Sequence, residues 1–362
     1  MLVIGVDAHK ASHFLVVVDE TGRKRAEKSV DATDLGHATA LRWVRHRFPE
    51  DELIWAIEDA RQVSGRFERF LLESGQRCVR VPTRLMARTR HETARTPGKS
   101  DEIDALAAAR AYLREPDLPV SCHDDDSREL KLLVDRRAAL IELRTANWNR
   151  VLWRIHEVDP GHKVGPLNMA RHRDPVRQWL TTQPGIVAEL AVMEIDDIAR
   201  LTAEANVLHR RIARRTKEIA PNLLELNGVG VLTAARIVGE TALVSRFCGK
   251  EAAFARFAGV APAPRWSGAS AGRMRYTKCG NRLLNSALHR SAVTQIRCPA
   301  TAGRAYYDKR ITQGDTPPMA LRCLKRRVCR SVFTRLNADY RLRYPSTPTT
   351  VTEQRPEAAI AQ

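Results

Sequence analysis

The sequence predicts an α/β domain over residues 1–125, a helical coiled-coil arm over residues 126–220 and a mainly α domain over residues 221–343. Short apolar runs alternate with helical patterns in the first region, which is typical of α/β organisation. The arm is predicted by long amphipathic patterns, and the third region by further helices joined by a glycine-containing turn. Residues 344–362 are polar and contain proline, so we expect a disordered tail.

The elements of the α/β region follow in order. The runs "MLVIGVD" and "SHFLVVVDETG" predict two strands with a short connection. A third apolar run, "ELIWAIEDA", predicts another buried strand. The segment "RFERFLLESG" predicts a helix that ends at Gly75, and "QRCVRVP" predicts the strand after it.

The arm begins after "EPDLPVSCHDDDS", where proline and aspartate interrupt the pattern. Residues 128–158 carry Leu, Val and Ile at three- and four-residue intervals without Gly or Pro, as a long amphipathic or coiled-coil helix requires. Residues 195–220 repeat this pattern. The two segments could pair as an antiparallel arm or form two ordinary bundle helices, and their spacing does not distinguish these arrangements.

Acidic residues occur where the first domain could bring them together. Asp7 and Glu58 each end an apolar strand, and Asp101 and Asp104 are three residues apart at the start of an Ala-rich helix, hence on one face. A ribonuclease-H-like fold would need acids in this order. Mg²⁺ prefers such oxygen ligands, and two ions can activate a nucleophile and stabilise a leaving oxygen. Individually, each acid could equally be solvated or complement a helix dipole.

Charge indicates the partner. Sixty Lys and Arg residues against 42 Asp and Glu give a net charge of +18. This charge favours a polyanionic partner, and nucleic acid more than a membrane surface. The seven cysteines form no CxxC pair and have no His partner at zinc-ligand spacing, so we expect reduced thiols in a cytoplasmic protein. No signal peptide or long apolar span is visible, and we expect no membrane partner.

A helix-hairpin-helix is predicted by "PNLLELNGVGVLTAARIVGE". A tight turn through Gly228, Val229 and Gly230 would join two helices, and its exposed amides could hold a DNA phosphate. The alternative is a glycine-rich turn between two core helices.

A loop serine, Ser267, follows in "APAPRWSGASAGRMRYTKCGN". Attack by serine on phosphate needs cations that offset the charge of the phosphoryl oxygens. Arg265, Arg273 and Lys278 lie close in sequence and could do so, and they could contact DNA. Ser270 matches the centre of a G-x-S-x-G hydrolase elbow, but "APAPRW" cannot supply the buried strand that this elbow requires.

At this point the chain resembles a known family, the DEDD transposases of the insertion sequence 110 family, which include bridge-RNA-guided recombinases. The resemblance rests on "IGVDAHK", "IEDA", "KSDEIDALAAARAYL", "LNGVGVLTAARIVGE", the Ser267 segment and "AYYDKRITQGDTPPMALRCLKRRV", in the family's order. It implies a RuvC-like first domain with Asp7, Glu58, Asp101 and Asp104 as Mg²⁺-binding acids. It also implies that Ser267 is the nucleophile of the C-terminal transposase domain, and that the arm is a dimer-forming coiled coil.

The resemblance further implies a partner set and a location. The partners are donor and target DNA, a guide RNA, and further copies of the chain in a dimer or tetramer; the location is the bacterial cytoplasm or nucleoid. Two other interpretations remain open. A structure-specific nuclease of the Holliday-junction type needs only the acids, and a non-catalytic nucleic-acid-binding protein needs only the charge and the helix-hairpin-helix.

Overall fold

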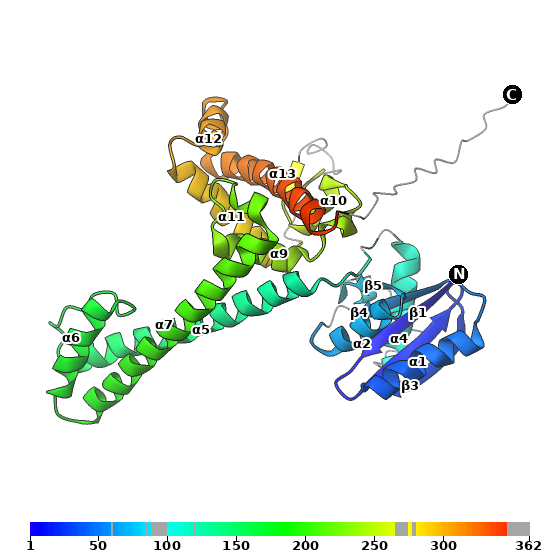
Figure 1. Cartoon of the computed structure of the whole chain (residues 1–362), viewed down its shortest axis with the longest axis horizontal. Helices are drawn as coiled ribbons and strands as arrows, with labels where there is room; N and C mark the ends of the chain where they lie inside the picture. Colours follow the sequence, from blue (N-terminus) through cyan, green and yellow to red (C-terminus); the bar gives the residue numbers. More distant parts are fainter. Residues whose placement is uncertain are drawn as a thin grey trace. The chain divides into compact units, whose positions relative to one another are not determined.

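The computed structural model describes residues 1–58, 61–83, 85–87, 100–116, 118, 120–264, 274–276 and 280–345. The chain divides into two compact units, Met1–His123 and Asp124–Gln362 (Figure 1). The arm and the C-terminal helices belong to the same unit, whereas the sequence-based division separates them at residue 220.

The first unit is built on a five-stranded mixed sheet in the order β3-β2-β1-β4-β5. The first three strands form antiparallel pairs, and β4 and β5 extend the sheet in parallel with β1. This arrangement confirms the predicted ribonuclease-H-like α/β class. The strands are β1 (Leu2–Ala8), β2 (Ser12–Val18), β3 (Lys24–Asp31), β4 (Leu53–Glu58) and β5 (Arg77–Val81).

Helices cover both faces of this sheet. On one face, Ile4 and Val6 of β1 share an apolar cluster with α1 (Asp34–Arg47) and α2 (Arg61–Glu73). On the other face, Val3 packs in a second cluster with the alanines of α4 (Asp101–Arg114). Both faces of the central strand are therefore buried, which explains why β1 is a continuous apolar run instead of an alternating one.

Gly5 sets the distance between β1 and α4. A Cβ atom at this position would lie 1.9 Å from the carbonyl oxygen of Ala105. Only glycine allows the helix backbone to approach the strand this closely. The small side chains of Ala105, Ala108 and Ala109, all buried, complete the contact. The first turn of α4 is thus held against the end of β1.

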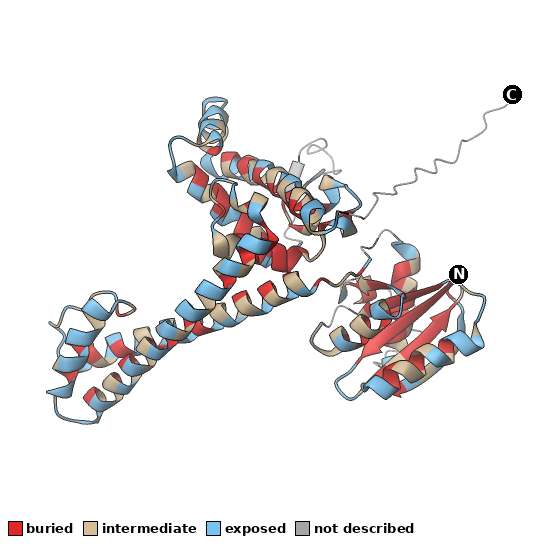
Figure 2. Ribbon diagram, viewed as in Figure 1, coloured by how far each residue is buried: buried red, intermediate tan, exposed pale blue. Residues whose placement is uncertain are grey.

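In the second unit, α5 (Asp125–Val158) and α7 (Ile186–Ile219) lie side by side and form the arm (Figure 1). Each has 34 residues, hence a length of about 51 Å. Buried residues line the faces that meet (Figure 2). At the far end, α6 (Ala170–Thr181) packs Val176 and Leu180 against both helices. The prediction of two long helices is confirmed, although α7 begins nine residues before the predicted segment, and of the two arrangements left open the structure has the paired one.

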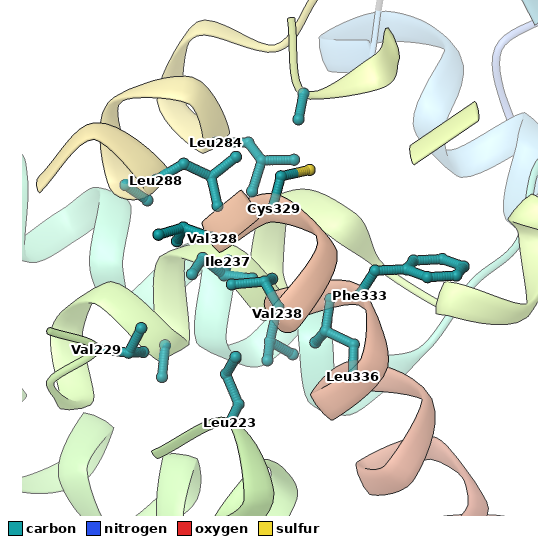
Figure 3. Packing of buried hydrophobic residues seen from close by; sticks show 14 of the residues in the cluster. Leu223, Val229, Ile237, Val238, Leu284, Leu288, Val328, Cys329, Phe333 and Leu336 are labelled. Atoms are coloured by element: carbon teal, nitrogen blue, oxygen red, sulfur yellow. The ribbon is translucent and has the colours of Figure 1, made fainter. Parts of the chain in front are cut away.

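The C-terminal helices surround a single apolar cluster (Figure 3). The long helix α13 supplies Val328, Phe333 and Leu336 to it, opposite Ile237 of α9 and Leu284 of α11. The elements are α8 (Pro221–Leu224), α9 (Val231–Thr241), the 3-10 helix η1 (Val244–Phe247), α10 (Glu251–Phe257), β6 (Pro262–Pro264), β7 (Met274–Tyr276), α11 (Arg282–Arg297), α12 (Ala302–Thr312) and α13 (Pro317–Arg343).

The base of the arm is part of this C-terminal core. Leu130 and Val134 of α5 and Ile212 and Ile219 of α7 belong to the same cluster as the residues of α9 and α13. Removing the arm at its base would therefore expose apolar surface of the C-terminal helices. This shared core is the physical reason why the arm and the C-terminal helices form one unit.

Candidate functional site

Two of the predicted acids stand side by side on neighbouring strands. Asp7 lies near the end of β1 and is 2% exposed, and Glu58 is the last residue of β4. The parallel pairing of Val6 with Ile57 makes Asp7 and Glu58 the next positions in register. Paired positions in a parallel sheet point to the same face. Both carboxylates therefore lie on the face that α4 covers.

The other two acids come from the first turn of α4. Ser100 caps this helix, and its hydroxyl accepts a hydrogen bond from the Ile103 amide at 3.3 Å. Asp101 and Asp104 are three residues apart and so share a helix face. Asp104 is buried, whereas Asp101 is exposed. The close contact at Gly5 brings this helix start to the strand ends, so all four acids meet at one end of the sheet.

The convergence is visible in the ionisation of Asp7. Burial raises the pKa of its carboxyl to about 6, and the neighbouring charges of Asp104, Glu58 and Asp101 raise it further. Only His9 acts in the opposite direction among the causes of this shift. A buried carboxyl surrounded by three others holds its negative charge at a cost, which a bound cation would relieve.

His9 is a member of this cluster that the sequence analysis missed. Its Nε2 atom lies 3.0 Å from Asp7 Oδ2 and 3.1 Å from Asp101 Oδ1. Burial lowers the pKa of His9, but the attraction of Asp7 and Asp101 outweighs this effect and raises it overall. The sequence did contain a signal for His9, because it follows Asp7 by two residues. Side chains two residues apart along an extended chain point to the same side.

Glu102, the acidic neighbour of Asp101, is placed differently. Glu102 forms an ion pair with Lys24 of β3 and so turns away from Asp101 and Asp104. The helix phase predicts this orientation. Asp59 lies outside the described residues.

A divalent cation fits this donor set. Among the described residues, Asp7, His9 and Asp101 each offer a ligand atom, and these atoms lie within 4.8 Å of one another. Asp7 Oδ2 is buried, and in this part of the chain no donor reaches it in hydrogen-bond geometry, although the His9 ring is near. Carboxylate oxygens supplemented by water suit a hard cation such as Mg²⁺.

The predicted serine site falls on residues that the structure does not describe. Ser267, Ser270, Arg265, Arg273 and Lys278 all lie outside the described residues. The described residues beside them are well anchored. Gly280 has a φ of +110°, and a Cβ atom there would lie 2.5 Å from the backbone nitrogen of Gly259. The Asn281 amide donates to the Phe257 carbonyl at 2.7 Å.

Asn281 also connects this region to the arm. It caps α11, and its side-chain amide donates to the buried carboxylate of Glu240 at 2.7 Å. Glu240 in turn pairs with Lys131 of α5 and Arg236 of α9. The chain therefore enters α11 at a point fixed by charges from two other helices.

The predicted DNA-contacting turn lies between α8 and α9. Gly228 has a φ of +81°, and a Cβ atom there would lie 2.5 Å from the Ser291 carbonyl oxygen of α11. Gly230 has a φ of −83°, is the N-cap residue of α9, is exposed and has open space where a Cβ would be. Gly228 is thus needed for packing, whereas Gly230 is available at the surface.

Comparison with known proteins identifies the family. A family model for the DEDD transposases of insertion sequence 110, described as Transposase, matches residues 4–157, and one described as Transposase IS116/IS110/IS902 family matches residues 220–308. The chain therefore belongs to the insertion sequence 110 family of DEDD transposases, and it is a DNA transposase or recombinase.

Relatives span nearly the whole chain. An uncharacterised 42 kDa protein of insertion element IS900 from Mycobacterium paratuberculosis is 26% identical, over 95% of this chain and 98% of that protein. An uncharacterised 44.8 kDa protein of insertion element IS116 from Streptomyces clavuligerus is 27% identical, over 96% of this chain and 98% of that protein.

Two solved RuvC structures from Thermus thermophilus resemble a third of the chain. One, in complex with a Holliday junction substrate, has a TM-score of 0.26 and 20% identity, over 33% of this chain and 99% of its own. The other has a TM-score of 0.27 and 21% identity, over 33% of this chain and 100% of its own.

Two further observations concern the described residues. None of the described helices is long and apolar enough to cross a membrane. Six cysteines lie among the described residues, and all six are free thiols.

Proposed function

We propose that this transposase cuts and rejoins DNA with a composite site, in which Asp7, Glu58, Asp101 and Asp104 hold Mg²⁺ and Ser267 is the nucleophile. The observation that supports it best is the meeting of the four acids around Asp7 at one end of the sheet, in a chain of this family. In this proposal Gly228, Gly230, Arg265, Arg273 and Lys278 contact DNA.

In this proposal the carboxylates bind the metal, and the basic residues and the serine act on the phosphate. Bound Mg²⁺ would supply positive charge at the phosphoryl oxygens and the leaving oxygen. The four carboxylates would hold it, with Asp7 and Glu58 fixed by the sheet and Asp101 and Asp104 by the capped start of α4. Arg265, Arg273 and Lys278 would offset further negative charge near the serine.

The proposed reaction has two reversible steps. Ser267 Oγ attacks a backbone phosphorus; a bond from this oxygen to phosphorus forms as a bond to one deoxyribose oxygen breaks, and that oxygen leaves as a hydroxyl. A deoxyribose hydroxyl of the recombining strand then attacks the phosphoserine, forming the new phosphodiester and returning the proton to serine. The covalent intermediate conserves phosphodiester energy between cutting and rejoining.

The proposal includes partners that follow from the family resemblance. They are donor and target DNA, a structured guide RNA, and further copies of the chain in a dimer or tetramer, in the bacterial cytoplasm or nucleoid. The net charge of +18 supports nucleic-acid partners.

The test uses amide replacements, which keep the shape of each carboxylate but remove the charge that holds Mg²⁺. Asp7→Asn, Glu58→Gln, Asp101→Asn and Asp104→Asn should each abolish Mg²⁺-dependent strand cleavage while DNA binding persists. Glu102→Gln is the matched control, because Glu102 shares the first turn of α4 but pairs with Lys24. Full cleavage by any two of the four variants would contradict the proposed metal site.

A further inference from the structure

A pocket lies among the C-terminal helices of the second unit, whereas the carboxylate cluster belongs to the first. Its volume is about 320 Å³, and four segments line it: the chain before the Gly228 turn, the end of α11, the start of α12 and the middle of α13. Ligand pockets commonly occupy about 300–1,000 Å³. It is therefore large enough for a small group such as a phosphate with part of a sugar.

The lining is basic. Arg327 and Arg330 of α13 both line the pocket and both are exposed, and none of its lining residues is acidic. Within the described part of the chain, neither guanidinium pairs with a carboxylate, whereas Asp308 of α12 is paired with Arg304 and Glu225 with Arg335. The pocket thus holds two positive charges that no nearby acid of these elements neutralises.

One of these arginines is already held in place. The Arg327 guanidinium lies over the Tyr306 ring, 4.1 Å from its centroid. Stacking on an aromatic face restricts the side chain while leaving its N–H groups free to donate. A preorganised guanidinium of this kind suits an oxyanion with several acceptor oxygens.

The start of α12 adds backbone donors. Thr301 caps this helix and accepts from the Arg304 amide at 3.1 Å. Ala302 and Gly303, the two residues between this cap and Arg304, line the pocket, and their backbone amides have no acceptor among the described residues. Free amides at a helix start favour an anion. They meet the arginines of α13 in the same pocket, so donors from two helices converge.

Gln295 fixes the geometry between the helix start and the turn. Its side-chain amide donates to the Asn227 carbonyl at 2.6 Å. A Cβ atom on Gly303 would lie 2.8 Å from the Gln295 Cβ atom, which cannot move away without the backbone of α11, so glycine lets α12 begin this close to α11. The pocket therefore adjoins the turn that ends at Gly230.

We propose that this pocket binds a backbone phosphate of nucleic acid, with Arg327, Arg330 and the amides of Ala302 and Gly303 as donors. The identity of the ligand rests on the proposed DNA contact of the C-terminal helices, but the site requires neither the metal nor Ser267. It gives the Gly228–Gly230 turn a neighbouring anchor on the same strand.

The test compares two double variants of the full-length protein. Arg327→Gln with Arg330→Gln removes both pocket charges. Arg290→Gln with Arg341→Gln removes two exposed arginines of α11 and α13 that do not line the pocket. Affinity is measured by fluorescence anisotropy across a salt series, with a short single-stranded DNA, its duplex and an RNA of the same sequence. Hydrogen exchange of the Ala302 and Gly303 amides is followed with and without each probe.

We expect the pocket variant to bind at least about tenfold more weakly and to lower the salt slope by about one relative to wild type, because one phosphate contact is lost. We also expect protection of the two amides by nucleic acid in wild type and in the control, and its loss in the pocket variant. Protection by DNA alone would identify DNA as the ligand, and equal protection by RNA a shared phosphate contact. No protection by any probe, or equal effects of both double variants, would overturn the proposal.

Failure of the proposed catalysis would look different. Wild-type protein that protects these amides but neither cleaves DNA nor forms a serine adduct would contradict the catalytic proposal and still support this pocket. DNA cleavage by the wild type without protection of these amides would support the catalytic proposal and contradict the pocket.

Discussion

The Nε2 atom of His9 lies 3.0 Å from the Oδ2 atom of buried Asp7. The histidine side chain is 47% exposed, so it stands on the solvent side of the carboxylate cluster. Its positive charge opposes the effect of burial and of the other three acids on Asp7. This pair links the most buried acid of the cluster to its exposed side.

Removing His9 should raise the pKa of Asp7 above its present value of about 6, because His9 is the group that lowers it. The measurement is a carbon-13 NMR titration of aspartate carboxyls in metal-free His9→Ala protein, with Asp7 assigned through Asp7→Asn. Lys10→Ala is the matched control, since it removes an adjacent exposed cation. An unchanged Asp7 pKa in His9→Ala would contradict the charge coupling.

A buried histidine pair should make stability depend on pH. The His13 ring stacks on Phe67 and the His37 ring lies tilted against it, with the two Nε2 atoms 3.3 Å apart. Burial, and then the charge of His37, lower the pKa of His13 to about 4, and burial also lowers that of His37. Below about pH 6.5 the unfolded chain therefore takes up a proton that the folded chain does not.

The free energy of unfolding should fall as pH decreases from about 6.5 to about 4, by on the order of 3 kcal/mol for His13. Urea denaturation at several pH values measures it. Asp7, with its raised pKa, acts in the opposite direction, so the quantity to compare is the difference between wild type and His13→Phe. A difference that stays constant over this range would show that His13 is protonated equally in both states.

The two glycines of the turn should separate folding from binding. Gly228→Val should destabilise the C-terminal helices by at least about 2 kcal/mol, because it forces a β-branched residue into positive φ and against Ser291. Gly230→Val should unfold near the wild-type temperature but bind DNA more weakly. Differential scanning calorimetry and anisotropy measure the two effects. Wild-type affinity in a folded Gly230→Val protein would remove this glycine from the proposed contact.

Ser267 should become linked to a cleaved DNA end. Protein, Mg²⁺, substrate DNA and any flanking RNA are incubated and denatured, and DNA-linked protein is detected by gel and located by peptide mapping. Ser267→Ala should abolish the adduct and recombination, because a recombinase needs the covalent intermediate. Ser270→Ala is the control and should retain both. Strand exchange without an adduct, or an adduct that persists in Ser267→Ala, would favour another nucleophile.

Local patterns determined the class of the first domain. A buried strand and an amphipathic helix each have their own residue period, and this period can be read without knowing what the element packs against. The strands that end near Asp7 and Glu58, the helix that starts at Asp101 and the long arm helices are all of this kind. The net charge and the family motifs are likewise properties of the sequence alone.

Tertiary structure decided which of these residues meet. Asp7 and Glu58 become neighbours only because β4 pairs in parallel with β1, and Asp101 reaches them only because Gly5 admits α4 so closely. The pocket around Arg327 likewise joins segments from residue 226 to residue 331, brought together by the packing of α11, α12 and α13. Such meetings depend on strand order and on contacts between distant segments, which a local periodicity does not encode. The sequence by itself therefore determined the elements and their chemistry, and packing determined the sites.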